Sequence, residues 1–231
     1  MKIGIHQPNF FPWLGFFNKI AIADKFIIYD NAQLPKKGGS WSNRVKLILS
    51  GEQRWVSANL DRDFSGTRCI NQSYFKNSKP WRENFIKSLE TNYSKHPFYK
   101  IHSQEIFDLI LFRDDNISEY NLNAIEKLCS ILNIDSRKIV LSSSLDIKSS
   151  ATQALIDFTK KLNGQTYLCG GGSETYLEED KFNQQGIKLE FQNYMHPIYD
   201  QRGSKEFISG LSILDALFNI GSKDLIKIIN C

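Results

Sequence analysis

Five short apolar runs along this chain predict the strands of one sheet. Each run is continuous rather than alternating, which is typical of strands buried on both faces of a parallel sheet. The runs cover residues 2–5, 25–29, 138–141, 166–168 and 187–191. Helix-like stretches separate most of them, so the pattern predicts an α/β fold with an open, mostly parallel sheet.

Apolar residues at helical spacing predict the helices between these strands. A helical face runs from Trp13 to Ile20, between the first two strands. Residues 34–72 interrupt the alternation with a β-hairpin, and residues 78–135 hold three helices that we expect to cap one side of the sheet. We therefore expect a single domain over residues 1–231, with a Rossmann-like sheet, an inserted hairpin and a helical cap.

Capping residues predict where several of the helices begin. Ser78 followed by Pro80 is typical of a helix start, and Ser118 is the expected N-cap of a later helix. Ser150 and Gln153 match a capping box, which predicts a helix directly after the third strand.

Charge and cysteine content narrow the class of partner. The formal net charge is +4 over 231 residues, and no basic stripe indicates DNA binding, so a small anionic ligand fits better. No apolar run has the length of a membrane span, and the start of the chain lacks a signal-peptide core. The four cysteines have neither disulfide-like nor metal-ligand spacing. We expect a cytoplasmic protein with free thiols, no metal site and no cofactor.

The carboxyl end of the first predicted strand carries the most distinctive polar residues. His6 and Gln7 follow this strand, and Pro8 and Pro12 hold the connection extended. Ligands bind at this end of the strands in open α/β sheets, and an imidazole exchanges protons near neutral pH. A hydrogen-bonded core histidine is an equally good interpretation of His6. Asp30 ends the second strand, where it would orient the imidazole, hold a ligand amine or simply cap its loop.

A second group of candidate residues lies at the start of the predicted hairpin. Lys36, Lys37, Asn43 and Arg44 surround Trp41, and cations beside an indole are suited to holding a phosphate next to a planar base. A solvated hairpin face explains the same residues without a ligand and is the default interpretation.

Further polar residues follow the fourth and fifth predicted strands. A glycine run between a strand and a helix exposes backbone amides that can bind an anion, although a tight turn without a ligand needs similar residues. The spacing matches neither a Walker A loop nor a dinucleotide-binding motif. The candidate ligand-binding residues in these two loops are Gly170, Gly171, Gly172, Ser173, Tyr176, Tyr199 and Gln201.

Four segments resemble the WbqC-like protein family and follow its order along the chain. They are GIHQPNFFPWLG at 4–15, WSNR at 41–44, YLCGGGSETYL at 167–177 and LSILDALFNIG at 211–221. Cys169 stands where the family pattern has serine, which puts a nucleophile at this position in doubt. The first strand and its Gln-Pro loop resemble, more loosely, the nucleotidyltransferase superfamily. The paired catalytic histidines of that superfamily would fall near Phe10 and Trp13, so the resemblance does not favour nucleotidyl transfer by the same mechanism.

The family resemblance implies a cytoplasmic protein of lipopolysaccharide O-antigen or related glycan synthesis. We expect a transferase that moves an aminoacyl (glycyl-like) or acyl group to the amine of a nucleotide-linked amino sugar. Its donor would be a carrier-protein thioester, an aminoacyl-tRNA or an activated acid. His6 would be the general base, Asp30 would orient it or bind the amine, and the glycine loop would stabilise an oxyanion or bind phosphate. The remaining expected substrate-binding residues are Gln7, Trp13, Asn43 and Arg44. A non-catalytic scaffold that only binds the nucleotide sugar is the alternative.

Overall fold

The five predicted strands form one parallel sheet. The computed structural model describes residues 1–77, 80–170 and 178–229. Its sheet has the order β5-β2-β1-β6-β7, and every neighbouring pair is parallel. The strands are β1 (Lys2–His6), β2 (Lys25–Ile28), β5 (Ile139–Leu141), β6 (Thr166–Cys169) and β7 (Lys188–Phe191). The predicted α/β class and open parallel sheet are confirmed.

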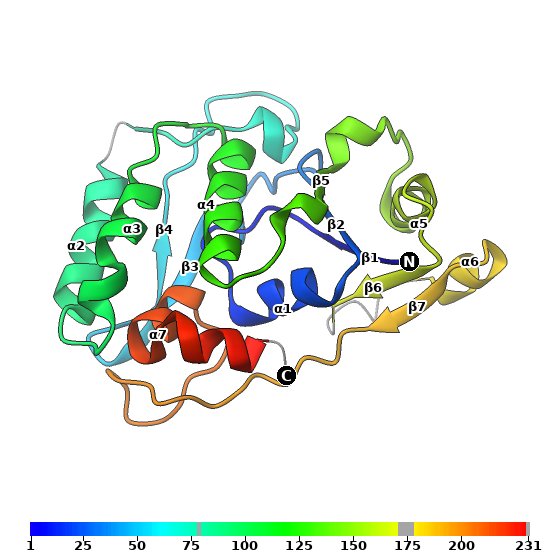
Figure 1. Ribbon diagram of the computed structural model, residues 1–231. Coiled ribbons are helices and arrows are strands. Elements are labelled where there is room, and N and C mark those ends of the chain that lie inside the picture. Colours follow the sequence, from blue (N-terminus) through cyan, green and yellow to red (C-terminus); the bar gives the residue numbers. More distant parts are fainter. Residues whose placement is uncertain (78–79, 171–177, 230–231) are drawn as a thin grey trace.

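Helices cover both faces of this sheet (Figure 1). One core contains side chains of α1 (Leu14–Ile22), α4 (Ile117–Ile131) and α7 (Ile213–Ile229), and the other contains side chains of α5 (Ala151–Lys161) and α6 (Glu179–Gln184). Alternation along β1 explains the division, because Ile3 and Ile5 belong to the core beneath α5 and α6. A Cβ added at Gly4, between them, would lie 2.8 Å from the ring of Phe26 in the other core.

The segment between β2 and β5 adds a second layer beside the sheet. The predicted antiparallel hairpin is β3 (Arg44–Leu49) with β4 (Glu52–Ser57); α2 (Trp81–Tyr93) packs on β3, and α3 (Tyr99–Ile110) packs on α2 and α7. Short 3-10 turns occupy Ile70–Gln72, Ser136–Lys138 and Ser142–Leu145. The hairpin turns at Ser50 and Gly51, whose φ angles of 54° and 84° suit a two-residue turn. Figure 1 places the hairpin on the side toward which β6 and β7 point, beyond the carboxyl ends of the sheet.

One predicted N-cap residue is wrong, and one predicted capping box is not formed. Asn116, and not Ser118, caps α4, because the Asn116 side chain accepts a hydrogen bond from the Ser118 amide at 3.0 Å. Ser150 precedes α5 but makes no side-chain cap bond, so the capping box expected with Gln153 is not formed. Ser78 lies outside the described residues.

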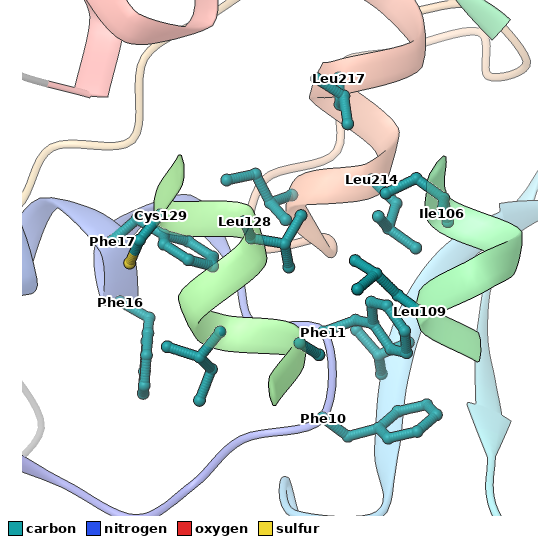
Figure 2. Close-up of a cluster of buried hydrophobic side chains, with 14 of the residues drawn as sticks. Phe10, Phe11, Phe16, Phe17, Ile106, Leu109, Leu128, Cys129, Leu214 and Leu217 are labelled. Carbon is teal, nitrogen blue, oxygen red and sulfur yellow. The ribbon is translucent and has the colours of Figure 1, made fainter. Parts of the chain in front are cut away.

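Two phenylalanines anchor the loop that leaves β1. Phe10 and Phe11 are 1% and 0% exposed, and they lie among side chains of α3, α4 and α7 that include Leu109, Leu128 and Leu214 (Figure 2). The φ of Phe11 is 43°, a left-handed conformation that residues other than glycine seldom adopt unless the surrounding structure enforces it. Phe10 and Phe11 therefore anchor the loop after β1 in the core that contains side chains of α1, α3, α4 and α7.

Candidate functional site

The strand order places a switch point between β1 and β6. The chain continues from β1 to β2 on one side, whereas β6 joins β1 from the other side. β1 pairs with β2 as far as His6 opposite Ile28, but it pairs with β6 only as far as Gly4 opposite Leu168. The two strands thus separate before their carboxyl ends. Open α/β sheets bind ligands at such a point.

A buried lysine that the sequence analysis missed lies at this separation. Lys19 of α1 is 3% exposed, and its Nζ donates a hydrogen bond to the carbonyl oxygen of Ile5 at 2.8 Å. Burial lowers the pKa of Lys19 to about 8, and the nearby Cys169 acts in the opposite direction. The ammonium lies 5.9 Å from the centre of the Tyr167 ring of β6. The sequence signal that could have identified Lys19 is its position three residues after Phe16, within an apolar helix.

His6 presents one ring nitrogen to accept a proton. Its Nδ1 lies 3.0 Å from the carbonyl oxygen of Gln7. Because a carbonyl only accepts, Nδ1 carries the proton and the lone pair is on Nε2. The ring packs edge-on against Phe16 at 5.0 Å. Burial, and then the charge of Lys19, lower the pKa of His6 from 6.5 to about 4, so the imidazole is neutral at pH 7.

Asp30 has both carboxylate oxygens occupied. It is 2% exposed; Oδ1 accepts hydrogen bonds from the Ser142 hydroxyl at 2.7 Å and the Ser143 amide at 2.9 Å, and Oδ2 accepts one from the Asn71 side chain at 3.1 Å. These bonds tie the end of β2 to the end of β5, as the loop-capping interpretation requires. Among the described residues no hydrogen bond joins Asp30 to His6, and its role toward the imidazole stays a prediction.

The glycine loop begins beside open space. A Cβ added at Gly170 would meet no atom of the described residues within 4 Å, and the backbone there is not left-handed. Within the described part of the chain, nothing fills the space beside Gly170. The other residues predicted in this loop, Gly171, Gly172, Ser173 and Tyr176, lie outside the described residues.

Trp13 lies at the start of α1 against the loop that follows β7. Its ring is stacked on His196 at 6.4 Å and 13°, and it meets Tyr194 edge-on at 5.5 Å. Gly15 gives it room, because a Cβ there would lie 2.3 Å from the indole. Gln7 is placed at the sheet edge, and its carbonyl fixes the tautomer of His6. Ligand contacts of Trp13 and Gln7 stay predictions.

Tyr199 and Gln201 surround a buried carboxylate. Asp215 of α7 is 0% exposed and accepts hydrogen bonds from Tyr93 at 2.9 Å, Tyr199 at 2.6 Å and Gln201 at 3.0 Å. Burial raises the pKa of Asp215, although its donors favour the ionised form. The network joins α2, α7 and the loop after β7, which gives Tyr199 and Gln201 a structural role. Their predicted ligand contacts stay predictions.

Asn43 and Arg44 lie next to each other at the start of β3 and line the same surface groove. Asn43 Oδ1 accepts a hydrogen bond from the Ser40 amide at 2.8 Å, and its Nδ2 donates one to the Ala58 carbonyl at 2.9 Å, so its amide holds the turn together. Arg44 lines a surface groove of about 610 Å³. The structure thus brings His6, Lys19 and Gly170 to the sheet edge and leaves Arg44 at the hairpin.

Thiols and acidic groups are dispersed over the structure. Cys69 and Cys129 are free cysteines, Cys169 donates a hydrogen bond to the Glu190 carbonyl at 3.3 Å, and Cys231 lies outside the described residues. In residues 1–77, 80–170 and 178–229, no cluster of histidine, cysteine and acidic side chains is arranged to hold a metal ion. Within the same ranges, no helix has the length and apolar character needed to cross a membrane.

The fold is that of an open parallel α/β protein, with His6 and Lys19 near the point where β1 and β6 separate. The chain belongs to the WbqC-like protein family, whose sequence model matches residues 7–227. It is similar to the uncharacterized protein Rv1507c of Mycobacterium tuberculosis, with 27% identity over 231 residues that cover 96% of this chain and 95% of that protein. No solved structure matches the chain.

Proposed function

We propose that this protein is a cytoplasmic transferase of O-antigen or related glycan synthesis. It transfers an aminoacyl (glycyl-like) or acyl group to the amine of a nucleotide-linked amino sugar. The observation that carries the proposal is the placement of a neutral His6 and a buried cationic Lys19 at the switch point between β1 and β6. Membership of the WbqC-like family supports the pathway.

The two side chains divide the chemistry of acyl transfer between them. The sugar amine attacks the acyl carbon of a thioester or ester donor, an N–C bond forms, and negative charge collects on the carbonyl oxygen. The C–S or C–O bond then breaks. His6 Nε2 takes the proton that the attacking amine loses and returns it to the departing thiolate or alkoxide. The ammonium of Lys19 stabilises the charge on the oxygen in a site largely shielded from water.

The low pKa of His6 determines which proton its imidazole can remove during the reaction. An imidazole with a pKa of about 4 is a weak base and does not deprotonate a free sugar ammonium efficiently. Once the amine has attacked, its nitrogen carries a full positive charge beside an electron-poor carbon and becomes much more acidic. We assign His6 to removal of that proton, with the ligand in the space beside Gly170 that the described residues leave unfilled.

One observation favours the alternative, a non-catalytic scaffold that binds a nucleotide sugar. The carboxylate of Asp30 is engaged by Ser142, Ser143 and Asn71, so it does not complete a catalytic pair with His6 in the described residues. A scaffold binds the nucleotide sugar without changing its mass.

Mass spectrometry separates these two functions. Purified protein is incubated with UDP- and dTDP-amino sugars and with aminoacyl or acyl donors, and we expect a mass gain on the sugar. His6→Asn should bind the sugar nucleotide yet lose about a hundredfold or more in turnover. His102→Asn, at a buried histidine of α3, is the matched control and should keep its turnover. Binding without a mass gain would establish the scaffold, and normal turnover in folded His6→Asn would remove His6 from the mechanism.

A further inference from the structure

Arg44 is a preorganised cation without an anion. Its guanidinium carbon lies 4.1 Å from the centre of the Trp55 ring, in a cation–π contact. It also lies against Gly39, because a Cβ added there would be 2.5 Å from Arg44 Cδ and 2.6 Å from Nε. In the part of the chain that the structure describes, Arg44 has no ion pair or side-chain hydrogen bond, and its Nε is buried without a partner. A guanidinium fixed in this way is suited to two-point contact with a phosphate.

The groove around Arg44 has a positive lining. Its volume of about 610 Å³ is within the usual range of ligand sites. Arg62 lines the groove and donates to the carbonyl of Gly38 at 2.6 Å, with no carboxylate partner among the described residues. Lys76 also lines it and pairs with Asp63 at 2.5 Å. Two of the three cations are therefore not neutralised by a carboxylate, which favours an anionic ligand.

A second, aromatic cleft adjoins this groove. It has a volume of about 220 Å³ and shares Ser57 and Asn59 with the groove. Trp55 and Trp81 line it; Trp81 is 4% exposed, and its Nε1 has no hydrogen-bond partner among the described residues. Buried indole N–H groups normally find an acceptor, and flat aromatic walls stack on nucleobases. A base in this cleft would supply both the stacking surface and the acceptor.

We propose that the groove and the cleft together bind a nucleoside diphosphate, with the phosphates on Arg44 and the base beside Trp55 and Trp81. This inference deepens the proposed function, on which it rests only in naming the nucleotide as the carrier of the amino sugar. A phosphopantetheine arm offers a phosphate but no planar ring, so the aromatic cleft favours a nucleotide.

The proposed nucleotide site is joined to the sheet edge by hydrogen bonds. The Phe10 amide, in the loop that follows His6, donates to the Trp41 carbonyl at 2.8 Å. The Asn121 side chain of α4 donates to the carbonyls of Pro8 at 3.0 Å and Ser42 at 2.8 Å. In Figure 1 the hairpin lies beyond the carboxyl ends of the strands. The nucleotide site is thus on the side of the molecule where the strands of the sheet end.

Calorimetry without any acyl donor tests the inference with pyrophosphate, UDP, dTDP and pantetheine 4′-phosphate. We expect UDP or dTDP to bind more tightly than pyrophosphate, and Arg44→Gln to weaken both classes by about tenfold or more. Ser88→Leu, which fills the aromatic cleft, should weaken the nucleotide by about tenfold and leave pyrophosphate unchanged. Among the described residues, the Ser88 hydroxyl bonds only the Asn84 carbonyl of its own helix, and leucine is a good helix former, so α2 is retained.

Two further variants separate the effect of the position of the Arg44 side chain from the effect of losing a positive charge. Arg54→Gln removes one exposed cation from the same hairpin, where Arg54 pairs with Glu52 at 3.0 Å, and it should bind like the wild type. Gly39→Ala keeps every charge but displaces the Arg44 side chain, and it should lose affinity as Arg44→Gln does. Melting temperatures identify unfolded variants. If Arg44→Gln unfolds, the affinities of Gly39→Ala and Ser88→Leu test the inference in its place.

Three results would overturn the inference. They are the absence of UDP and dTDP binding, an equal loss of affinity in Arg44→Gln and Arg54→Gln, and a preference for pantetheine 4′-phosphate. Because no donor is present, a failure here together with a mass gain in the transfer assay leaves the transferase proposal standing and moves the nucleotide elsewhere.

Discussion

Replacing Lys19 by methionine should change how the stability of the protein depends on pH. The side chain is 3% exposed, and burial lowers its pKa from 10.5 to about 8. At about 1.4 kcal/mol per pKa unit, the buried charge destabilises the fold by about 3 kcal/mol at pH 7. The unfolded chain binds this proton more tightly, so stability rises as the pH increases through 8 toward 10.5. Between about pH 7 and about pH 9.5, Lys19 alone should add about 2 kcal/mol to the free energy of unfolding.

Urea unfolding of the wild type and Lys19→Met across this pH range measures the effect. At pH 7, methionine removes the buried charge but leaves the Ile5 carbonyl without its donor, which costs about 1–3 kcal/mol. The two proteins should therefore have similar free energies of unfolding at pH 7, and the wild type should become the more stable by about 2 kcal/mol near pH 9.5. Lys87→Met, at an exposed position of α2, controls for the loss of a charge. Parallel stability curves for the wild type and Lys19→Met would refute the perturbed pKa.

Three other substitutions or profiles test the remaining parts of the site. Gly170→Leu should fold, because its Cβ would meet no atom of the described residues within 4 Å, yet weaken nucleotide-sugar binding by about tenfold in calorimetry; unchanged affinity would place the ligand elsewhere. Tyr199→Phe removes the 2.6 Å hydrogen bond to Asp215 and should lower the free energy of unfolding by about 1.5–3 kcal/mol in urea titration, whereas no change would mean that the bond is not made in solution. At a fixed concentration of the neutral sugar amine, turnover should not fall as the pH decreases from 8 through 6.5, because the pKa of His6 is about 4, and it should fall above about 8 as Lys19 loses its proton. A loss of turnover centred near pH 6.5 in a pH–rate profile would contradict this assignment.

The sheet was predictable from sequence because burial on two faces leaves a local signal. β1 and β2 contain the apolar runs Ile3–Ile5 and Phe26–Ile28, which can be recognised without knowing which strands lie beside them. α6 was not predicted, because Phe182 is its one buried residue and gives no helical period. α7 continues beyond Gly221, whose φ of 72° kinks the helix, since Leu225 and Ile229 remain buried after it.

The site was predictable only where it follows directly from a strand end. His6 and Gly170 lie at the edge because the chain leaves the sheet there. Tyr199 was expected at the same edge, but it follows β7 by several residues, and its hydrogen bond to Asp215 is set by the packing of α7. Lys19 was missed because periodicity treats a charged helix residue as exposed. Its burial depends on the separation of β1 and β6, which no local pattern encodes.

The charge of Lys19 and the lowered pKa values at the switch point favour an anionic ligand there. Burial disfavours the protonated forms of both His6 and Lys19, and the charge of Lys19 lowers the pKa of His6 further. An anion bound between β1 and β6 would attract both groups and raise both pKa values. A developing oxyanion has the same charge, so it would make His6 a stronger base at the moment when the attacking amine must lose its proton. Binding of an anionic ligand at about pH 8 should then take up protons, because Lys19 is only partly protonated in the free protein at that pH.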